Sequence, residues 1–131
     1  MSRPATLAEV ARRSSEGTQD FSYALREFLD SFYGADTSQR GAMLADQPVQ
    51  LSDPAEHAYL GAVAEYLARR WQCPIPAWSN DPSRFLRRPY FTTPIEDLKA
   101  MLLVESPLAF RRRMIFTEQQ PLRRARMPAG T

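Results

Sequence analysis

Four dipeptides that pair a helix-capping residue with a proline constrain this chain more than any other feature. They are Asp53-Pro54, Asp81-Pro82, Thr93-Pro94 and Ser106-Pro107. The side-chain oxygen of Asp, Thr or Ser accepts a hydrogen bond from a free amide of the first helical turn. Proline fits the next position because the amide that it lacks has no partner there. Each pair therefore predicts the start of a helix.

Apolar periodicity predicts further helices in the N-terminal half. Phe21, Leu25, Phe28 and Phe32 recur at a spacing that places them on one helical face, and Gly34 is suited to end that helix. Caps and spacing together predict six short helices, over about residues 7–13, 19–34, 38–45, 54–71, 94–104 and 107–113, with a single helical turn at 82–87.

The predicted fold class is all-α. The chain has 131 residues, the length of one domain, and no alternating apolar pattern is long enough for a sheet. We expect a compact multi-helix domain over residues 1–116, with a proline-rich loop, followed by a basic C-terminal tail over 117–131.

The residues needed for most catalytic and metal sites are scarce. His57 is the only histidine and Cys73 the only cysteine, and the five glycines are scattered. A zinc site needs three or four suitable ligands, and a phosphate loop needs clustered glycines. We therefore expect no enzymatic activity, no metal and no cofactor. The longest apolar run, residues 100–104, is too short for a signal peptide or a membrane helix, so we expect a cytoplasmic protein with no membrane partner.

The charge is unevenly distributed. Residues 106–131 carry a net charge of +5, whereas residues 1–105 carry −3. A basic end can bind the phosphates of DNA or an acidic protein surface, and both readings remain open. Residues 5–13 resemble the first helix of lac-type helix-turn-helix repressors, but Ser14-Ser15-Glu16-Gly17 departs from the turn of that motif.

Two segments, residues 73–91 and 106–116, combine aromatic residues with arginine or proline. Aromatic and arginine side chains dominate binding hot spots, and a proline-fixed loop presents them at a low entropic cost. Trp71 and the group Ile95, Leu98, Met101 and Leu102 are expected to point into the core, whereas Trp78 fits either the core or a contact surface. The predicted partner-binding residues are Trp78, Phe85, Arg87, Arg88, Arg111, Arg112, Arg113 and Phe116.

The second half of the chain resembles a group of small bacterial proteins encoded beside nucleotidyltransferase-type toxins. The motifs that carry this resemblance are Asp53-Pro54, Leu67-Ala-Arg-Arg-Trp71, Pro74-x-Pro-Ala-Trp78, Asp81-Pro-Ser-Arg-Phe85, Val104-Glu-Ser-Pro-Leu-Ala-Phe-Arg-Arg-Arg-Met-Ile-Phe116 and Leu122 with Arg124-Ala125. Arg123 stands where the family has a serine. The resemblance implies an antitoxin that neutralises a cognate nucleotidyltransferase toxin by direct contact. The alternatives are a DNA-binding regulator, possibly of its own operon, and a helical accessory protein.

Overall fold

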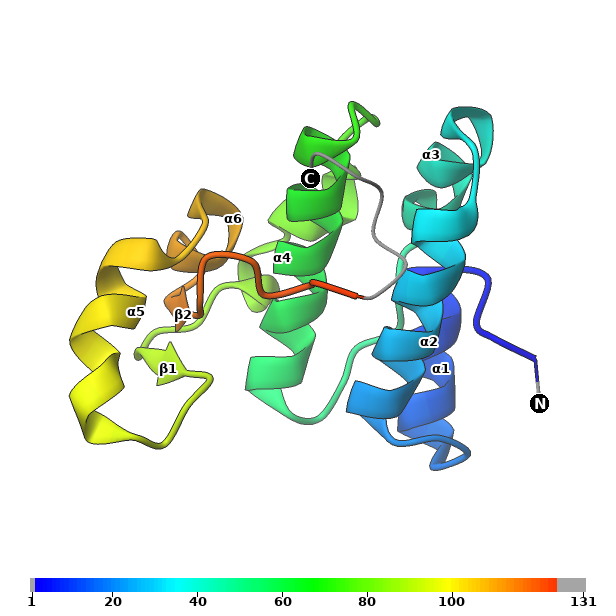
Figure 1. Cartoon of the computed structure of the whole chain (residues 1–131). Helices are drawn as coiled ribbons and strands as arrows, with labels where there is room; N and C mark the ends of the chain where they lie inside the picture. Colours follow the sequence, from blue (N-terminus) through cyan, green and yellow to red (C-terminus); the bar gives the residue numbers. More distant parts are fainter. Residues whose placement is uncertain (1, 125–131) are drawn as a thin grey trace.

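The computed structural model describes residues 2–124 and is mostly helical, which confirms the predicted fold class (Figure 1). Its α-helices are α1 (Leu7–Glu16), α2 (Phe21–Gly34), α3 (Thr37–Ala45), α4 (Pro54–Arg70), α5 (Lys99–Glu105) and α6 (Leu108–Arg111). The other secondary-structure elements of residues 2–124 are three 3₁₀ turns and two short strands. The turns are η1 (Ala77–Asn80), η2 (Pro82–Arg84) and η3 (Glu96–Leu98), and the strands are β1 (Tyr90–Phe91) and β2 (Ile115–Phe116).

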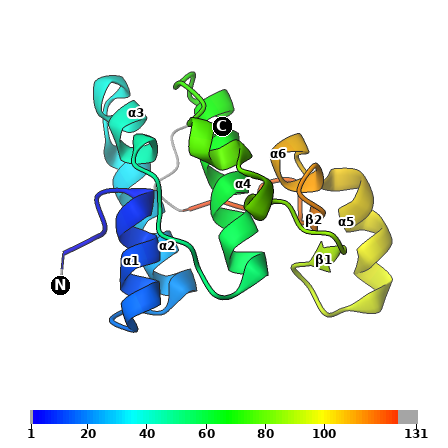
Figure 2. The same ribbon diagram turned by 180° about the vertical axis from the view of Figure 1, so that it is seen from behind.

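The elements form three layers side by side. Helices α1, α2 and α3 make one outer layer, α4 with η1 and η2 beside it makes the middle, and α5, α6 and the strands make the other outer layer (Figures 1 and 2). Helix α4 is the longest, with 17 residues, and its central position places one face against each outer layer. Ten of its residues are buried, so it is the helix around which the core is built.

Two of the four predicted cap–proline starts are confirmed. Asp53 Oδ1 accepts a hydrogen bond from the amide of Ala55 at 2.8 Å, and α4 begins at Pro54. Asp81 accepts one from the amide of Ser83 at 2.9 Å at the start of η2. In both cases the capping bond joins residues two apart, so the local sequence is sufficient to form it.

The other two predicted starts are wrong. Thr93 binds the amide of Ile95, but Ile95 is extended and the helical turn begins only at Glu96. The Ser106 side chain does not cap α6. Its hydroxyl donates to the carbonyl of Leu102 and accepts from the amide of Thr117 at 2.8 Å. Because the Ser106 hydroxyl bonds a residue eleven positions away, it makes no capping hydrogen bond to the helix that follows.

The phenylalanine stripe forms the centre of the core, as predicted. Phe28 and Phe32 are fully buried on α2, and Phe21 packs edge to face against Tyr59 of α4 with ring centroids 6.4 Å apart. Gly17 ends α1 in the left-handed conformation (φ 76°), which glycine adopts without strain. Helix α2 follows directly and closes against α1.

The strands β1 and β2 are a tertiary feature that the sequence analysis did not predict. They pair in parallel, with Tyr90 opposite Ile115 and Phe91 opposite Phe116. Each strand has two residues, too few to show an alternating pattern. The rings of Phe91 and Phe116 stack 5.2 Å apart, so side-chain packing accompanies the backbone pairing.

The segment 117–124 belongs to the domain rather than to a free tail. It crosses α4 and reaches α2 (Figure 1). Leu122 is buried, and its carbonyl accepts a hydrogen bond from the hydroxyl of Tyr33 at 2.9 Å. Arg124 donates to both carboxylate oxygens of Asp30 at 2.9 and 3.0 Å. The boundary predicted at residue 116 is therefore too early, and the rest of the predicted tail lies outside the described residues.

Candidate protein-interaction surface

Three of the eight predicted partner-binding residues lie in the interior. Arg113 has no exposed surface, and Trp78 and Phe116 are 8% and 7% exposed. The indole nitrogen of Trp78 donates to the carbonyl of Leu44 at 3.1 Å, which fixes the ring against α3. These three side chains stabilise the fold and cannot reach a partner in this conformation, so they are removed from the candidate surface.

Arg113 is the centre of a buried charge cluster. Its Nη1 donates to Glu65 Oε1 of α4 at 2.7 Å, and Glu65 is only 1% exposed. Arg69 and Arg112 also bind this carboxylate, at 2.8 and 3.3 Å. Burial raises the pKa of Glu65, but the hydrogen bonds and charges of the arginines outweigh it, so the pKa lies below its usual value. The cluster ties the end of α6 to the middle of α4.

A second buried arginine lies beside the first. Arg84 is 2% exposed, and it donates to the carbonyls of His57 at 2.9 Å and Pro48 at 3.1 Å. Both arginines cross α4 at Gly61, where an added Cβ would lie 3.0 Å from Arg113 Nε and 3.2 Å from Arg84 Cβ and Cδ. Glycine at this position allows the two side chains to pass close to the helix backbone.

The remaining five predicted residues lie on two adjacent segments. The amide of Leu86 donates to the carbonyl of Arg113 at 3.3 Å, so the segment around residues 85–88 runs beside the end of α6. The Arg112 guanidinium lies over the Phe85 ring at 5.2 Å, and that of Arg113 lies over the same ring at 4.7 Å. The buried cluster thus supports this region from beneath.

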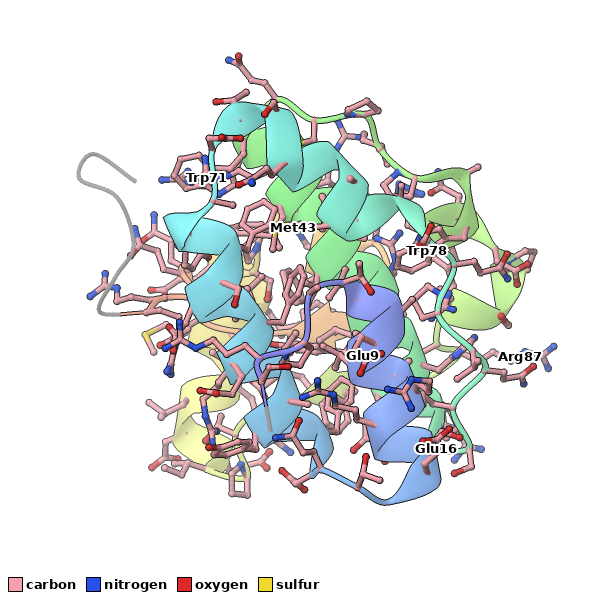
Figure 3. All side chains as sticks on the ribbon, turned by 90° about the vertical axis from the view of Figure 1, so that its right-hand side faces the viewer. Glu9, Glu16, Met43, Trp71, Trp78 and Arg87 are labelled. Atoms are coloured by element: carbon pink, nitrogen blue, oxygen red, sulfur yellow. The ribbon has the colours of Figure 1, made fainter. Side chains whose placement is uncertain are left out.

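We call this region the arginine face. Its residues are Phe85, Arg87, Arg88, Arg111 and Arg112. Phe85 is half-buried and the four arginines are exposed. Arg87 projects away from the body of the protein at its edge (Figure 3). The Arg112 guanidinium is bound to Glu65 and Asn80, so the face combines an aromatic ring with three other exposed guanidinium groups, which can form bidentate contacts with carboxylates.

The only histidine lies in a polar chain that superficially resembles a catalytic arrangement. His57 Nδ1 accepts from the amide of Leu51 at 3.2 Å, which assigns the ring proton to Nε2. Nε2 lies 2.9 Å from Ser83 Oγ, and the Ser83 hydroxyl donates to Asp81 at 2.7 Å. His57 therefore has no free nitrogen with which to activate Ser83. These hydrogen bonds link α4, η2 and the loop that precedes α4.

The arrangement of α2 does not suit a recognition helix. Eight of its residues are buried, including Phe21, Phe28 and Phe32. A helix that reads DNA must present side chains to a groove, whereas α2 buries these side chains in one core with α1 and α4. The resemblance of residues 5–13 to a repressor helix is therefore not continued in the following helix.

Residues 2–124, which the structure describes, contain neither a clustered set of metal ligands nor a membrane helix. Within residues 2–124, His, Cys, Asp and Glu nowhere form a group of three that could hold a metal ion. No helix in this range is long and apolar enough to cross a membrane.

Sequence reasoning missed that most apolar side chains of α5 and of the turn before it are exposed. Ile95, Leu98 and Met101 were expected to point inward, but they are 55%, 37% and 44% exposed. Only Leu102 of α5 is buried. The signal was present in the run Met-Leu-Leu-Val, which is apolar on every side of the helix.

Comparisons with known proteins add no further constraint on the site. No protein-family model, curated protein or solved structure matches the chain. The geometry of the arginine face is therefore the structural evidence for a contact surface.

Proposed function

We propose that this chain is an antitoxin-like binding protein that neutralises a nucleotidyltransferase-type toxin by direct contact, with the arginine face as the contact surface. The observation that carries the proposal is the position of Arg87, Arg88 and Arg111. All three are exposed, on two adjacent backbone segments that a hydrogen bond from Leu86 to Arg113 joins beside a buried ion cluster. A rigid surface loses little conformational entropy on binding.

The chemistry of the partner class suits this surface. An enzyme that transfers a nucleotide holds Mg²⁺ through carboxylates, so the mouth of its active site is acidic. Guanidinium groups bind carboxylates with two parallel hydrogen bonds. A cationic face seated over that mouth would exclude the nucleotide and neutralise the enzyme without any chemistry of its own.

The proposal predicts a nucleotidyltransferase encoded beside this chain, and co-expression with that enzyme in a strain that the enzyme alone inhibits tests it. The wild-type chain should restore growth and co-purify with the enzyme. The double variant Arg87→Glu/Arg88→Glu should do neither, because it changes the charge of these two positions by four units, from +2 to −2. It should keep its helical circular dichroism, since both side chains are exposed.

A matched control separates the arginine face from net charge. Arg26 and Arg70 are also exposed, on α2 and at the end of α4. The variant Arg26→Glu/Arg70→Glu changes the net charge equally and should rescue growth like the wild type. The proposal fails if Arg87→Glu/Arg88→Glu protects the cells and co-purifies as well as this control.

A further inference from the structure

A cavity of about 370 Å³ lies between α2 and the first turns of α4. Strand β1 and the C-terminal segment 117–124 complete its wall, so four parts of the chain that are distant in sequence meet around it (Figure 1). Cavities of this size accommodate small molecules. None of the lining residues belongs to the arginine face, so the cavity is a separate candidate site and goes beyond the proposed function.

Part of the cavity wall is apolar and is held in place by the core. Phe21, Leu25 and Leu29 follow one face of α2, and Leu122 belongs to the C-terminal segment. All four side chains are buried. Phe21 also packs edge to face against Tyr59 of α4, so a ligand group that reaches this wall meets an ordered apolar surface. Contact with such a surface removes hydrocarbon from water and favours binding.

Two charged side chains of opposite sign line the same cavity and remain unpaired. Within residues 2–124, neither Arg26 of α2 nor Glu56 of α4 forms an ion pair or a side-chain hydrogen bond. Arg123, which Gln120 holds by a hydrogen bond at 2.9 Å, adds a second guanidinium to the wall. Burial and the nearby charge of Asp53 raise the pKa of Glu56, so a cation beside this carboxylate would be stabilising.

The lining therefore suits a ligand with three different parts. An anionic group fits Arg26, a cationic N–H donor fits Glu56, and an apolar group fits the surface of α2. A purely apolar ligand would cover both charges without compensation, which is costly. A ligand with negative charge alone would meet Glu56 with like charge. The hydroxyl of Tyr59, which makes no hydrogen bond within residues 2–124, offers a further polar contact.

We propose that this cavity binds a free α-amino acid with a large apolar side chain. The carboxylate of the ligand binds the guanidinium of Arg26 with two parallel hydrogen bonds, the geometry that this pair of groups favours. The ammonium group donates to Glu56, and the apolar side chain packs against Phe21 and Leu25. An α-amino acid carries all three groups on one carbon atom, so one small molecule satisfies the whole lining.

Isothermal titration calorimetry of the full chain near neutral pH tests the proposal with three related ligands. They are L-phenylalanine, 3-phenylpropionate, which lacks the ammonium group, and 2-phenylethylamine, which lacks the carboxylate. L-Phenylalanine should bind with a Kd of about 0.1 mM, a usual strength for so small a ligand. Each of the other two should bind at least about tenfold more weakly, because each loses a charge-assisted hydrogen bond.

Two variants assign the charged groups. Arg26→Gln should weaken L-phenylalanine and 3-phenylpropionate by about tenfold and leave 2-phenylethylamine unchanged. Glu56→Gln should weaken L-phenylalanine and 2-phenylethylamine and leave 3-phenylpropionate unchanged. Arg70→Gln and Glu16→Gln are the matched controls, because both positions are exposed and lie outside the cavity, and they should bind like the wild type. Unchanged circular dichroism and urea midpoints show that every variant is folded.

A second measurement follows the wall of the cavity. Bound L-phenylalanine should slow amide exchange in residues 122–124, which line it. The proposal is overturned if the wild type binds no L-phenylalanine at about 10 mM, or if the three ligands bind equally well, which would indicate a non-specific apolar site. Arg26→Gln should still neutralise the toxin, and Arg87→Glu/Arg88→Glu should still bind L-phenylalanine, so this proposal and the proposed function can fail separately.

Discussion

Replacement of Glu65 by glutamine should strongly destabilise the fold, because it removes the carboxylate that Arg113 meets in the interior. Both side chains are essentially inaccessible, at 1% and 0% exposure. Breaking one partner of a buried pair costs about 3–5 kcal/mol, since the other charge remains buried. Glutamine keeps an oxygen that accepts a hydrogen bond, so we expect the lower end of this range, about 3 kcal/mol.

The other two arginines that bind Glu65, Arg69 and Arg112, contribute less to the free energy of unfolding than Arg113 does. The side chains of Arg69 and Arg112 are 54% and 35% exposed. Solvent screens such pairs, and each is worth at most about 1 kcal/mol. With a urea m-value of about 1.5–2 kcal/mol/M, a loss of about 3 kcal/mol lowers the unfolding midpoint by about 1.5–2 M. Tryptophan fluorescence and far-ultraviolet circular dichroism should report the same midpoint.

The pH dependence of this loss gives an independent check. The pKa of Glu65 is lowered in the folded protein from its ordinary value of 4.5. Its stabilising contribution is therefore fully present above pH 4.5 and is lost as the pH falls toward the folded pKa. The difference in unfolding free energy between wild type and Glu65→Gln should shrink below that pH.

Two further variants make the test specific. Glu16→Gln alters an exposed ion pair with Arg12 and should leave the midpoint unchanged. Adding Arg113→Met to Glu65→Gln should cost less than the sum of the two single changes, because the orphaned charge is removed with its partner. A loss of less than about 1 kcal/mol for Glu65→Gln would refute the idea that this pair is a stabilising centre of the fold.

Three other perturbations probe neighbouring parts of the structure. Gly61→Ala should destabilise the protein by about 1–3 kcal/mol through overpacking, whereas Gly34→Ala, whose Cβ would meet nothing within 4 Å, should not; urea midpoints compare the two. Burial and the charge of Arg84 lower the pKa of His57 below 6.5, so the folded state favours the neutral ring. Stability from His57 is then present above pH 6.5 and lost as the pH falls through its folded pKa, and His57→Asn should flatten a plot of unfolding free energy against pH over this window. Tyr33→Phe removes the hydroxyl bond to the C-terminal segment and should cost about 1 kcal/mol, with faster amide exchange confined to residues 117–124; uniform exchange would contradict a local role.

The features that the sequence determined by itself depend on short-range geometry. The caps at Asp53 and Asp81 bond amides two residues away, and Phe28 and Phe32 share a face because of the helical repeat alone. No distant residue is needed for either effect, so the start of α4 and the inward face of α2 could be read directly.

Only the tertiary structure decided which charged and apolar side chains are exposed. Arginine is rarely buried without a partner, and the partner of Arg113 lies 48 residues earlier, on α4. Ser106 likewise bonds Thr117 instead of capping the next helix. Most apolar side chains of α5 stay exposed, because Leu102 is the only one of its residues that the fold buries. Burial depends on what the rest of the chain brings to a site, and a local pattern holds no information about residues that are distant in sequence. The arginine face therefore contains fewer residues than the sequence predicted, and the exposure of the apolar side chains of α5 follows only from the packing of the whole domain.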